Sequence, residues 1–156
     1  MDINKNSYVF IFASVMVIIV AALLSSTAIG LKPLQDRNIE LEKKQNILSS
    51  VRINIDRQEA EEIYEKYIKQ ELVLNNKGER IEGSAFDIEL KKEVKKTPDA
   101  QALPLFISEI DGNTKYIIPL LGKGLWGPIW GFISLEEDLN KVYGAVFDHK
   151  SETPGL

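Results

Sequence analysis

The stretch LPLFISEIDGNTKYIIPL, residues 103–120, decides the fold. Two apolar runs, residues 103–110 and 114–120, flank the pair Asp111-Gly112. Runs of this length with two-residue periodicity are typical of strands. Glycine readily takes the positive φ that a tight hairpin turn needs. The stretch therefore predicts two antiparallel strands joined at Asp111-Gly112.

Strand-like runs continue on both sides of this hairpin. We predict strands at residues 71–75, 129–135 and 142–148, with a turn at residues 75–78, NNKG. Before the first of these strands, apolar residues recur at helical spacing and predict an amphipathic helix of about four turns. Its apolar positions are Ala60, Ile63, Tyr64, Tyr67 and Ile68.

The start of that helix carries a capping pattern. Asp56 is followed three residues later by Glu59, and such a pair predicts a capping box with Asp56 at the N-cap. A helix that precedes a set of antiparallel strands indicates an α+β domain. We place this single domain at residues 53–156.

Residues 8–31, YVFIFASVMVIIVAALLSSTAIGL, are uncharged and strongly apolar. As a helix they would extend about 36 Å, enough to cross a hydrocarbon core of about 30 Å. A cleaved signal peptide is the alternative, because Ala28-Ile29-Gly30 resembles a cleavage site. The apolar region exceeds the roughly 7–15 residues usual in signal peptides. We therefore predict an N-terminal tail and retained transmembrane helix at residues 1–31.

The segment after the span is highly charged. We predict a juxtamembrane helical linker at residues 32–52, with Pro33 in its first turn. Lys5 is the only basic residue before the span, whereas four follow it closely: Lys32, Arg37, Lys43 and Lys44. Basic residues concentrate on cytoplasmic loops, so this count alone favours a cytoplasmic C-terminal side.

Composition excludes several classes of function. The net charge is −4, and there are no cysteines and one histidine, His149. Disulfides, thiolate metal sites and cysteine nucleophiles are therefore excluded, and we predict no metal site. The basic cluster Lys91, Lys92, Lys95 and Lys96 is interleaved with Glu89 and Glu93. We interpret it as a solvated surface rather than a nucleic-acid site.

The only two tryptophans, Trp126 and Trp130, lie in GKGLWGPIWGFISL, residues 122–135, whose first ten residues hold four glycines. The pattern is neither a Walker loop nor a dinucleotide fingerprint. One interpretation is a glycine-rich turn with tryptophan rings in the core, and we expect Trp130 to be a core residue. The other is a loop whose backbone approaches a ligand while a tryptophan shields an aromatic ring.

The C-terminal residues 148–156, DHKSETPGL, follow the last predicted strand. Asp148 or Glu152 could pair with His149 as a general base, although a solvated histidine is the commoner use of such a loop. No serine lies in a G-x-S-x-G context. We therefore predict no catalytic residue and exclude a secreted hydrolase.

Three stretches together closely resemble one family, that of the C subunit of the bacterial sodium-translocating NADH:quinone reductase. They are NSYVFIFASVMVIIVAALLSSTAIGLKPLQDRN…LEKKQNIL, GKGLWGPIWGFISL and HKSETPGL, and the resemblance covers essentially the whole chain. It implies one N-terminal transmembrane helix and an α+β flavin-binding domain outside the cytoplasm. It also implies an electron-carrying FMN within a multi-subunit inner-membrane complex that pumps sodium, in which partner subunits handle NADH and quinone.

In that family FMN is esterified to a threonine in a C-terminal S-G-A-T-type motif, which this sequence does not contain. We expect the acceptor threonine to lie beyond residue 156 in a longer chain, and Thr153 is not that acceptor. The resemblance implies an FMN site that includes Trp126, Glu152, Thr153, Gly155 and Leu156. The alternatives are a membrane-anchored scaffold without cofactor and a non-functional truncated product.

Overall fold

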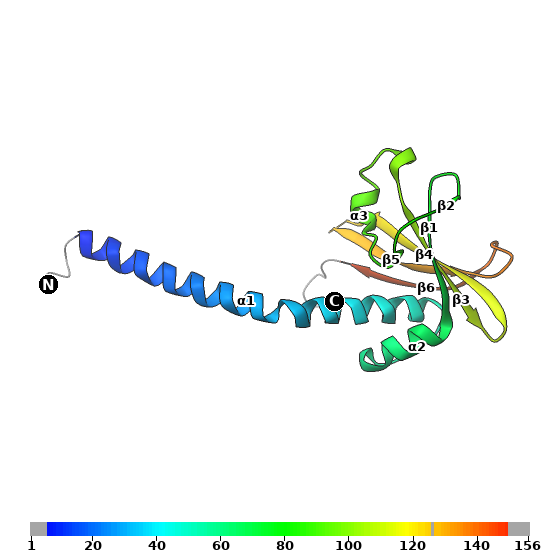
Figure 1. Cartoon of the computed structure of the whole chain (residues 1–156), viewed down its shortest axis with the longest axis horizontal. Coiled ribbons are helices and arrows are strands. Elements are labelled where there is room, and N and C mark those ends of the chain that lie inside the picture. The colour runs from blue at the N-terminus through cyan, green and yellow to red at the C-terminus, as the bar shows by residue number, and fades with distance from the viewer. Residues whose placement is uncertain (1–5, 126, 150–156) are drawn as a thin grey trace. The chain divides into compact units, whose positions relative to one another are not determined.

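The computed structural model describes residues 6–125 and 127–149. The chain divides into two compact units, Met1–Glu40 and Leu41–Leu156. Helix α1 (Asn6–Ser50) contributes residues to both units (Figure 1). The second unit holds the strands and the other helices.

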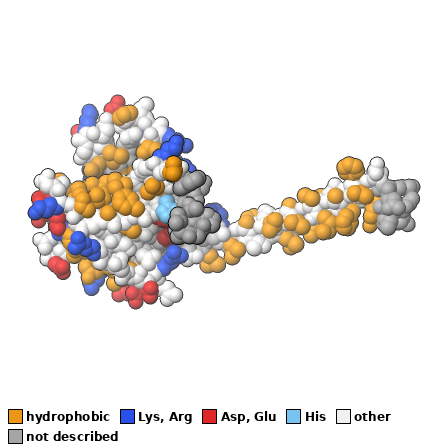
Figure 2. Space-filling view, turned by 180° about the vertical axis from the view of Figure 1, so that it is seen from behind, with side chains coloured by type: hydrophobic (Ala, Val, Ile, Leu, Met, Phe, Trp, Pro, Cys, Tyr) orange, Lys and Arg blue, Asp and Glu red, His pale blue; other side chains and the backbone are white. Residues whose placement is uncertain are grey.

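In the first unit, α1 exposes its apolar side chains. Phe10 is 74% exposed and Ile18 is 66% exposed, and Figure 2 shows hydrophobic side chains along the helix. The helix is long and apolar enough to cross a membrane, a test that a signal sequence would also pass. The hydroxyls of Ser26 and Thr27 donate to the carbonyls of Ala22 and Leu23, each at 2.8 Å, so both groups are satisfied within the helix.

The predicted helix start at Pro33 is wrong, because α1 continues through this residue. An interior proline removes one hydrogen bond and costs about 3 kcal/mol. Helical residues on both sides can propagate past one lost bond, since propagation is easier than nucleation. An ion pair between Lys32 and Asp36, at 3.2 Å, also bridges the turn around Pro33.

The second unit is built on one antiparallel sheet with the strand order β2-β1-β3-β4-β5-β6. The bounds of the strands are β1 Ile68–Leu74, β2 Arg80–Ile81, β3 Leu103–Ile110, β4 Asn113–Lys123, β5 Pro128–Leu135 and β6 Val142–His149. The α+β class predicted from the sequence is confirmed. Figure 1 shows the strands as one twisted sheet.

The predicted turns form as expected. Asp111 and Gly112 have φ values of 51° and 76°, the pair of positive angles that a tight two-residue hairpin requires. In the turn after β1, Gly78 has φ of 78°. The Oδ1 of Asn75 accepts hydrogen bonds from the backbone N–H groups of Lys77 and Glu79, each at 2.9 Å.

The helix before the sheet is shorter than predicted. A 3-10 turn, η1 (Arg57–Glu59), leads into α2 (Ala60–Tyr67), and Ile68 already begins β1. Asp56 precedes η1, but its side chain makes no capping hydrogen bond, so the predicted capping box is wrong. The other short helices are α3 (Leu90–Glu93) and η2 (Pro98–Ala100).

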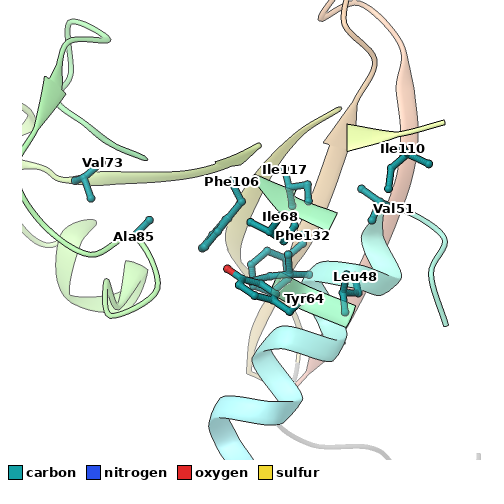
Figure 3. Close-up of a cluster of buried hydrophobic side chains, with 11 residues drawn as sticks. Leu48, Val51, Tyr64, Ile68, Val73, Ala85, Phe106, Ile110, Ile117 and Phe132 are labelled. Carbon is teal, nitrogen blue, oxygen red and sulfur yellow. The ribbon is translucent and has the colours of Figure 1, made fainter. Parts of the chain in front are cut away.

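The buried cluster lies between one face of the sheet and the helices. Phe106 and Phe132 meet edge to face, with ring centroids 6.4 Å apart. Leu48, Val51 and Tyr64 belong to the same buried cluster, and Figure 3 shows Tyr64 beside Phe132 and Val51 nearer Ile110. Residues of the predicted 32–52 linker thus contribute directly to the core of the second unit.

Side chains on the other face of the sheet are also apolar, including Leu105, Ile107 and Ile118. Ile129 is 38% exposed and Phe147 is 59% exposed. Hydrophobic side chains gather on the surface of this unit beside His149, shown in pale blue in Figure 2. The strands are therefore apolar on both faces.

The end of α1 packs closely against β5 and β6. The Oγ of Ser134 donates to the carbonyl of Ser50 at 2.6 Å. A Cβ on Gly144 would lie 2.3 Å from that same carbonyl oxygen. The chain then leaves the helix through Arg52, at a φ of 64°, with its guanidinium carbon 4.6 Å from the ring centroid of Tyr143. Only glycine lets β6 approach this closely.

Gly144→Ala should lower the free energy of unfolding by about 2 kcal/mol, because the added methyl group forces the helix end away from β6. Urea unfolding of the detergent-solubilised chain, followed by tryptophan fluorescence, measures the change. Gly122→Ala is the matched control, since a Cβ there has no neighbour within 4 Å. Equal stability of both variants and the wild type would contradict the close approach.

Candidate functional site

The glycine–tryptophan stretch forms the connection between β4 and β5. Lys123 and Pro128 are the last pair of the ladder, and the N–H of Gly124 donates to the carbonyl of Gly127 at 2.7 Å. Gly127 has φ of 154°, a value that favours glycine. A Cβ on Gly124 would lie 2.6 Å from the Cδ1 of Ile129. The glycines therefore permit a tight turn at this end of the sheet.

A pocket of about 630 Å³ lies beside this turn. Its walls come from α3, from the end of β4 and from the start of β5. This volume is in the range of small-molecule and cofactor sites. The lining residues are Leu90, Lys91, Leu120, Leu121, Gly122, Lys123, Gly127, Pro128 and Trp130.

Trp130 forms part of the pocket wall and is only half-buried. It is opposite Leu121 in the β4–β5 ladder and opposite Asp148 in the β5–β6 ladder. The expectation that Trp130 is a core residue is wrong. The buried aromatic residue of β5 is Phe132, two positions further along the same face. An aromatic ring in the wall of an apolar pocket can stack on a planar ligand.

Helix α3 is held in place by a buried carboxylate that the sequence pattern did not reveal. Glu93 is buried, and its two oxygens accept from the Lys96 Nζ at 2.7 Å and from the Ala102 N–H at 2.9 Å. The hydrogen bond from Lys96, and then that from Ala102, lower the pKa of Glu93 from its ordinary value of 4.5. The prediction that this cluster is only a solvated surface is wrong at Glu93.

The segment before α3 is also anchored. The Nζ of Lys43 donates to the carbonyl of Phe86 and lies 4.5 Å from the centroid of its ring. Tyr64 meets Phe86 edge to face, with ring centroids 6.1 Å apart. These contacts fix the chain just before Leu90 and Lys91, two residues of the pocket wall.

Five predicted FMN-binding residues lie outside the described residues: Trp126, Glu152, Thr153, Gly155 and Leu156. Gly127, directly after Trp126, and Lys123, three residues before Trp126, line the pocket. At the end of β6, the Oδ1 of Asp148 accepts from the backbone N–H of His149 at 2.7 Å. This contact uses the backbone rather than the imidazole of a general-base pair.

No protein-family model matches the chain. It is similar to the C subunit of the Na(+)-translocating NADH-quinone reductase of Pasteurella multocida, with 31% identity over 98% of this chain and 67% of that protein. It is 29% identical to the corresponding protein of Vibrio anguillarum, over 99% of this chain and 66% of that protein. The Haemophilus ducreyi protein of the same name is 27% identical over 89% of this chain.

A solved structure is similar as well. The crystal structure of the same reductase component from Parabacteroides distasonis aligns with a TM-score of 0.74 and 42% sequence identity, over 81% of this chain and 61% of that chain. The chain also spans only 61% of the length of the Haemophilus ducreyi relative.

Glu93→Gln should make the stability of the protein less sensitive to acid. Because the folded-state pKa of Glu93 is lowered, its ionised form contributes stability above pH 4.5, and this contribution is lost as the pH falls through the lowered pKa. Urea midpoints measured between pH 7 and about pH 3 should therefore fall less steeply in the variant.

The control for this measurement is Glu89→Gln, which removes an exposed ion pair with Lys92 at 2.8 Å from the same helix. An exposed pair of this kind contributes little to stability. If Glu93→Gln and Glu89→Gln have the same pH dependence as the wild type, Glu93 does not anchor α3.

Proposed function

The chain belongs to the family of the C subunit of the Na(+)-translocating NADH-quinone reductase, and on that premise we propose that it is an FMN-carrying electron-transfer subunit of a sodium-pumping complex. The complex would lie in a bacterial inner membrane, anchored here by residues 8–31. Other membrane subunits are its proposed partners, and they would handle NADH and quinone. The proposed organisation is a membrane segment at residues 1–31, a linker at 32–52 and an FMN-binding domain at 53–156.

The pocket beside the β4–β5 turn is the single observation that carries this proposal. FMN combines a flat aromatic ring system with a charged phosphate. The pocket is lined by the indole ring of Trp130 and by the apolar side chains of Leu121 and Pro128. It is also lined by Gly122 and Gly127, which have no side chain. The residues present therefore fit the shape and chemistry of a flavin.

FMN supplies the redox chemistry when it is bound, and the protein needs no nucleophile or general acid for electron relay. Trp130 would stack on the ring system, while the leucine and proline walls exclude water. We further propose that Trp126, Glu152, Thr153, Gly155 and Leu156 complete this site.

Trp130→Ala should weaken FMN binding by at least about tenfold, because it removes the stacking surface of the pocket. Titration of the detergent-solubilised chain with FMN, followed by flavin fluorescence, measures the dissociation constant. Phe147→Ala is the control, since this aromatic residue is 59% exposed and does not line the pocket. Unchanged affinity in Trp130→Ala would place FMN elsewhere or nowhere in this chain.

The proposed orientation puts the second unit outside the cytoplasm, opposite to the count of basic residues. The chain has no cysteine, so a maleimide can react only with a cysteine that is introduced, and the reaction shows on which side of the membrane that position lies. Lys141→Cys, at an exposed position before β6, should react with a membrane-impermeant maleimide in intact spheroplasts. Ser7→Cys, at the other end of the span, should react only after lysis. The reverse pattern would establish a cytoplasmic domain.

A further inference from the structure

The turn between β4 and β5 carries a strongly exposed leucine. Leu125 is 89% exposed, compared with 59% for Phe147 and 38% for Ile129 at the same end of the sheet. The Ile129 side chain packs beside Gly124, next to Leu125, and the Phe147 ring lies over Gly131. The three side chains form an exposed apolar strip, and such a surface marks contact with an apolar partner.

The path of α1 shows which end of the second unit is tethered. Near the point where α1 enters the unit, Lys43 donates to the carbonyl of Phe86. Phe86 lies four residues before Leu90, which lines the pocket beside the β4–β5 turn. Ser50, the last residue of α1, instead accepts from Ser134, near the β5–β6 turn. The helix therefore enters the unit at the end of the sheet that carries the β4–β5 turn.

The tether is short. Ten positions separate Leu31, the last residue of the proposed membrane segment, from Leu41, where the second unit begins. Even a fully extended chain of this length reaches at most about 35 Å. The end of the unit at which α1 enters is therefore held near the bilayer surface at any angle between the two units.

Charge distinguishes the two turns at the ends of β5. Residues 119–135, which include the β4–β5 turn, contain one basic residue, Lys123, and no acidic residue. The β5–β6 turn also exposes a leucine, Leu139 at 57%, but Glu137 and Asp138 directly precede it. Anionic lipid headgroups attract the lysine of the first turn and repel the carboxylates of the second. An apolar side chain beside a basic one is the pattern of interfacial membrane contacts.

We infer that the β4–β5 turn is a lipid-contacting surface, in which Leu125 enters the interfacial layer of the bilayer and Lys123 faces anionic headgroups. Because the unit is tethered, a weak contact is enough, since binding of the turn is an intramolecular event. The inference rests on the proposed membrane anchor at residues 8–31 and is independent of the proposed flavin.

The test uses the absence of cysteine from the chain. Leu125→Cys, Leu139→Cys and Val17→Cys are each labelled with the fluorophore NBD. The full chain is then reconstituted in vesicles of phosphatidylcholine and phosphatidylglycerol. Nitroxide-labelled phosphatidylcholine quenches NBD that touches lipid, on either side of the bilayer. Circular dichroism confirms that each variant is folded.

Two positions serve as controls for Leu125→Cys. Leu139 is the matched control, because it is an exposed leucine in the turn at the other end of β5, about 26 Å along the strand. Val17 lies within the proposed span and reports whether α1 is in the bilayer.

NBD at position 125 should be quenched at least threefold more than NBD at position 139, and NBD at position 17 should be quenched strongly. Vesicles of phosphatidylcholine alone, or the added change Lys123→Gln, should lower the quenching at position 125 and leave that at position 17 unchanged.

The outcomes separate the inference from the anchor on which it rests. If position 17 is quenched and position 125 is not, the anchor stands and the turn does not contact lipid. If position 17 is not quenched, the anchor and the inference fail together. Equal quenching at positions 125 and 139 would overturn the assignment to this turn. NBD at position 125 that is unquenched in vesicles but blue-shifted in native membranes would assign the turn to a partner subunit instead.

Discussion

The second unit depends on the close contact between the last turn of α1 and the β5–β6 pair. The final carbonyl groups of a helix have no partner within the helix. Here the Ser50 carbonyl accepts from the hydroxyl of Ser134, and Gly144 leaves room for it. A larger residue at either strand position would separate the helix from the sheet. This contact holds Leu48 over the aromatic cluster.

The helix ends in a way that supports the same contact. The N–H of Ile53 donates to the Leu48 carbonyl at 3.1 Å, and Arg52 adopts a left-handed conformation. This arrangement satisfies helix carbonyls and usually employs glycine, so a non-glycine residue there is disfavoured. The guanidinium of Arg52 lies over the ring of Tyr143 in β6. A cation–π contact with the strand therefore offsets the backbone conformation that turns the chain away.

The pocket continues the same sheet face that forms the core. Along β5, Phe132 lies in the buried cluster and Trp130, two residues earlier, lines the pocket. Along β4, Ile117 is buried and Leu121 lines the pocket. This face is core in one part and pocket in another because different elements cover it. At this end of β4 the covering element is α3, which is only four residues long. A ligand in the pocket would thus contact an extension of the hydrophobic core.

The hairpin and most strand boundaries could be predicted because turn residues and two-residue periodicity are local. The long apolar helix at residues 8–31 could be predicted for the same reason, because its lack of charge is visible in the local sequence. The failures include one local feature and one property that depends on tertiary contacts. Asp56 has the right spacing for a capping box, but its side chain makes no cap in the fold. Trp130 is a large aromatic residue of a kind often found in cores. It lines the pocket instead, because α3, which covers this end of the sheet, is short. The predicted FMN residues from 152 to 156 lie outside the described residues.

The spacing of residues along the sequence explains why Lys91 forms no ion pair with Glu89 or Glu93. Side chains three or four positions apart meet on a helix, whereas those two apart do not. Glu89 and Lys92 are three apart, as are Glu93 and Lys96, and both pairs form. Lys91 lies two residues after Glu89 and two before Glu93, so neither carboxylate is placed to neutralise it. Among the described residues, this alternation leaves Lys91 and Lys95 without an acidic partner. Of these two lysines, Lys91 lines the pocket, because α3 packs on β4.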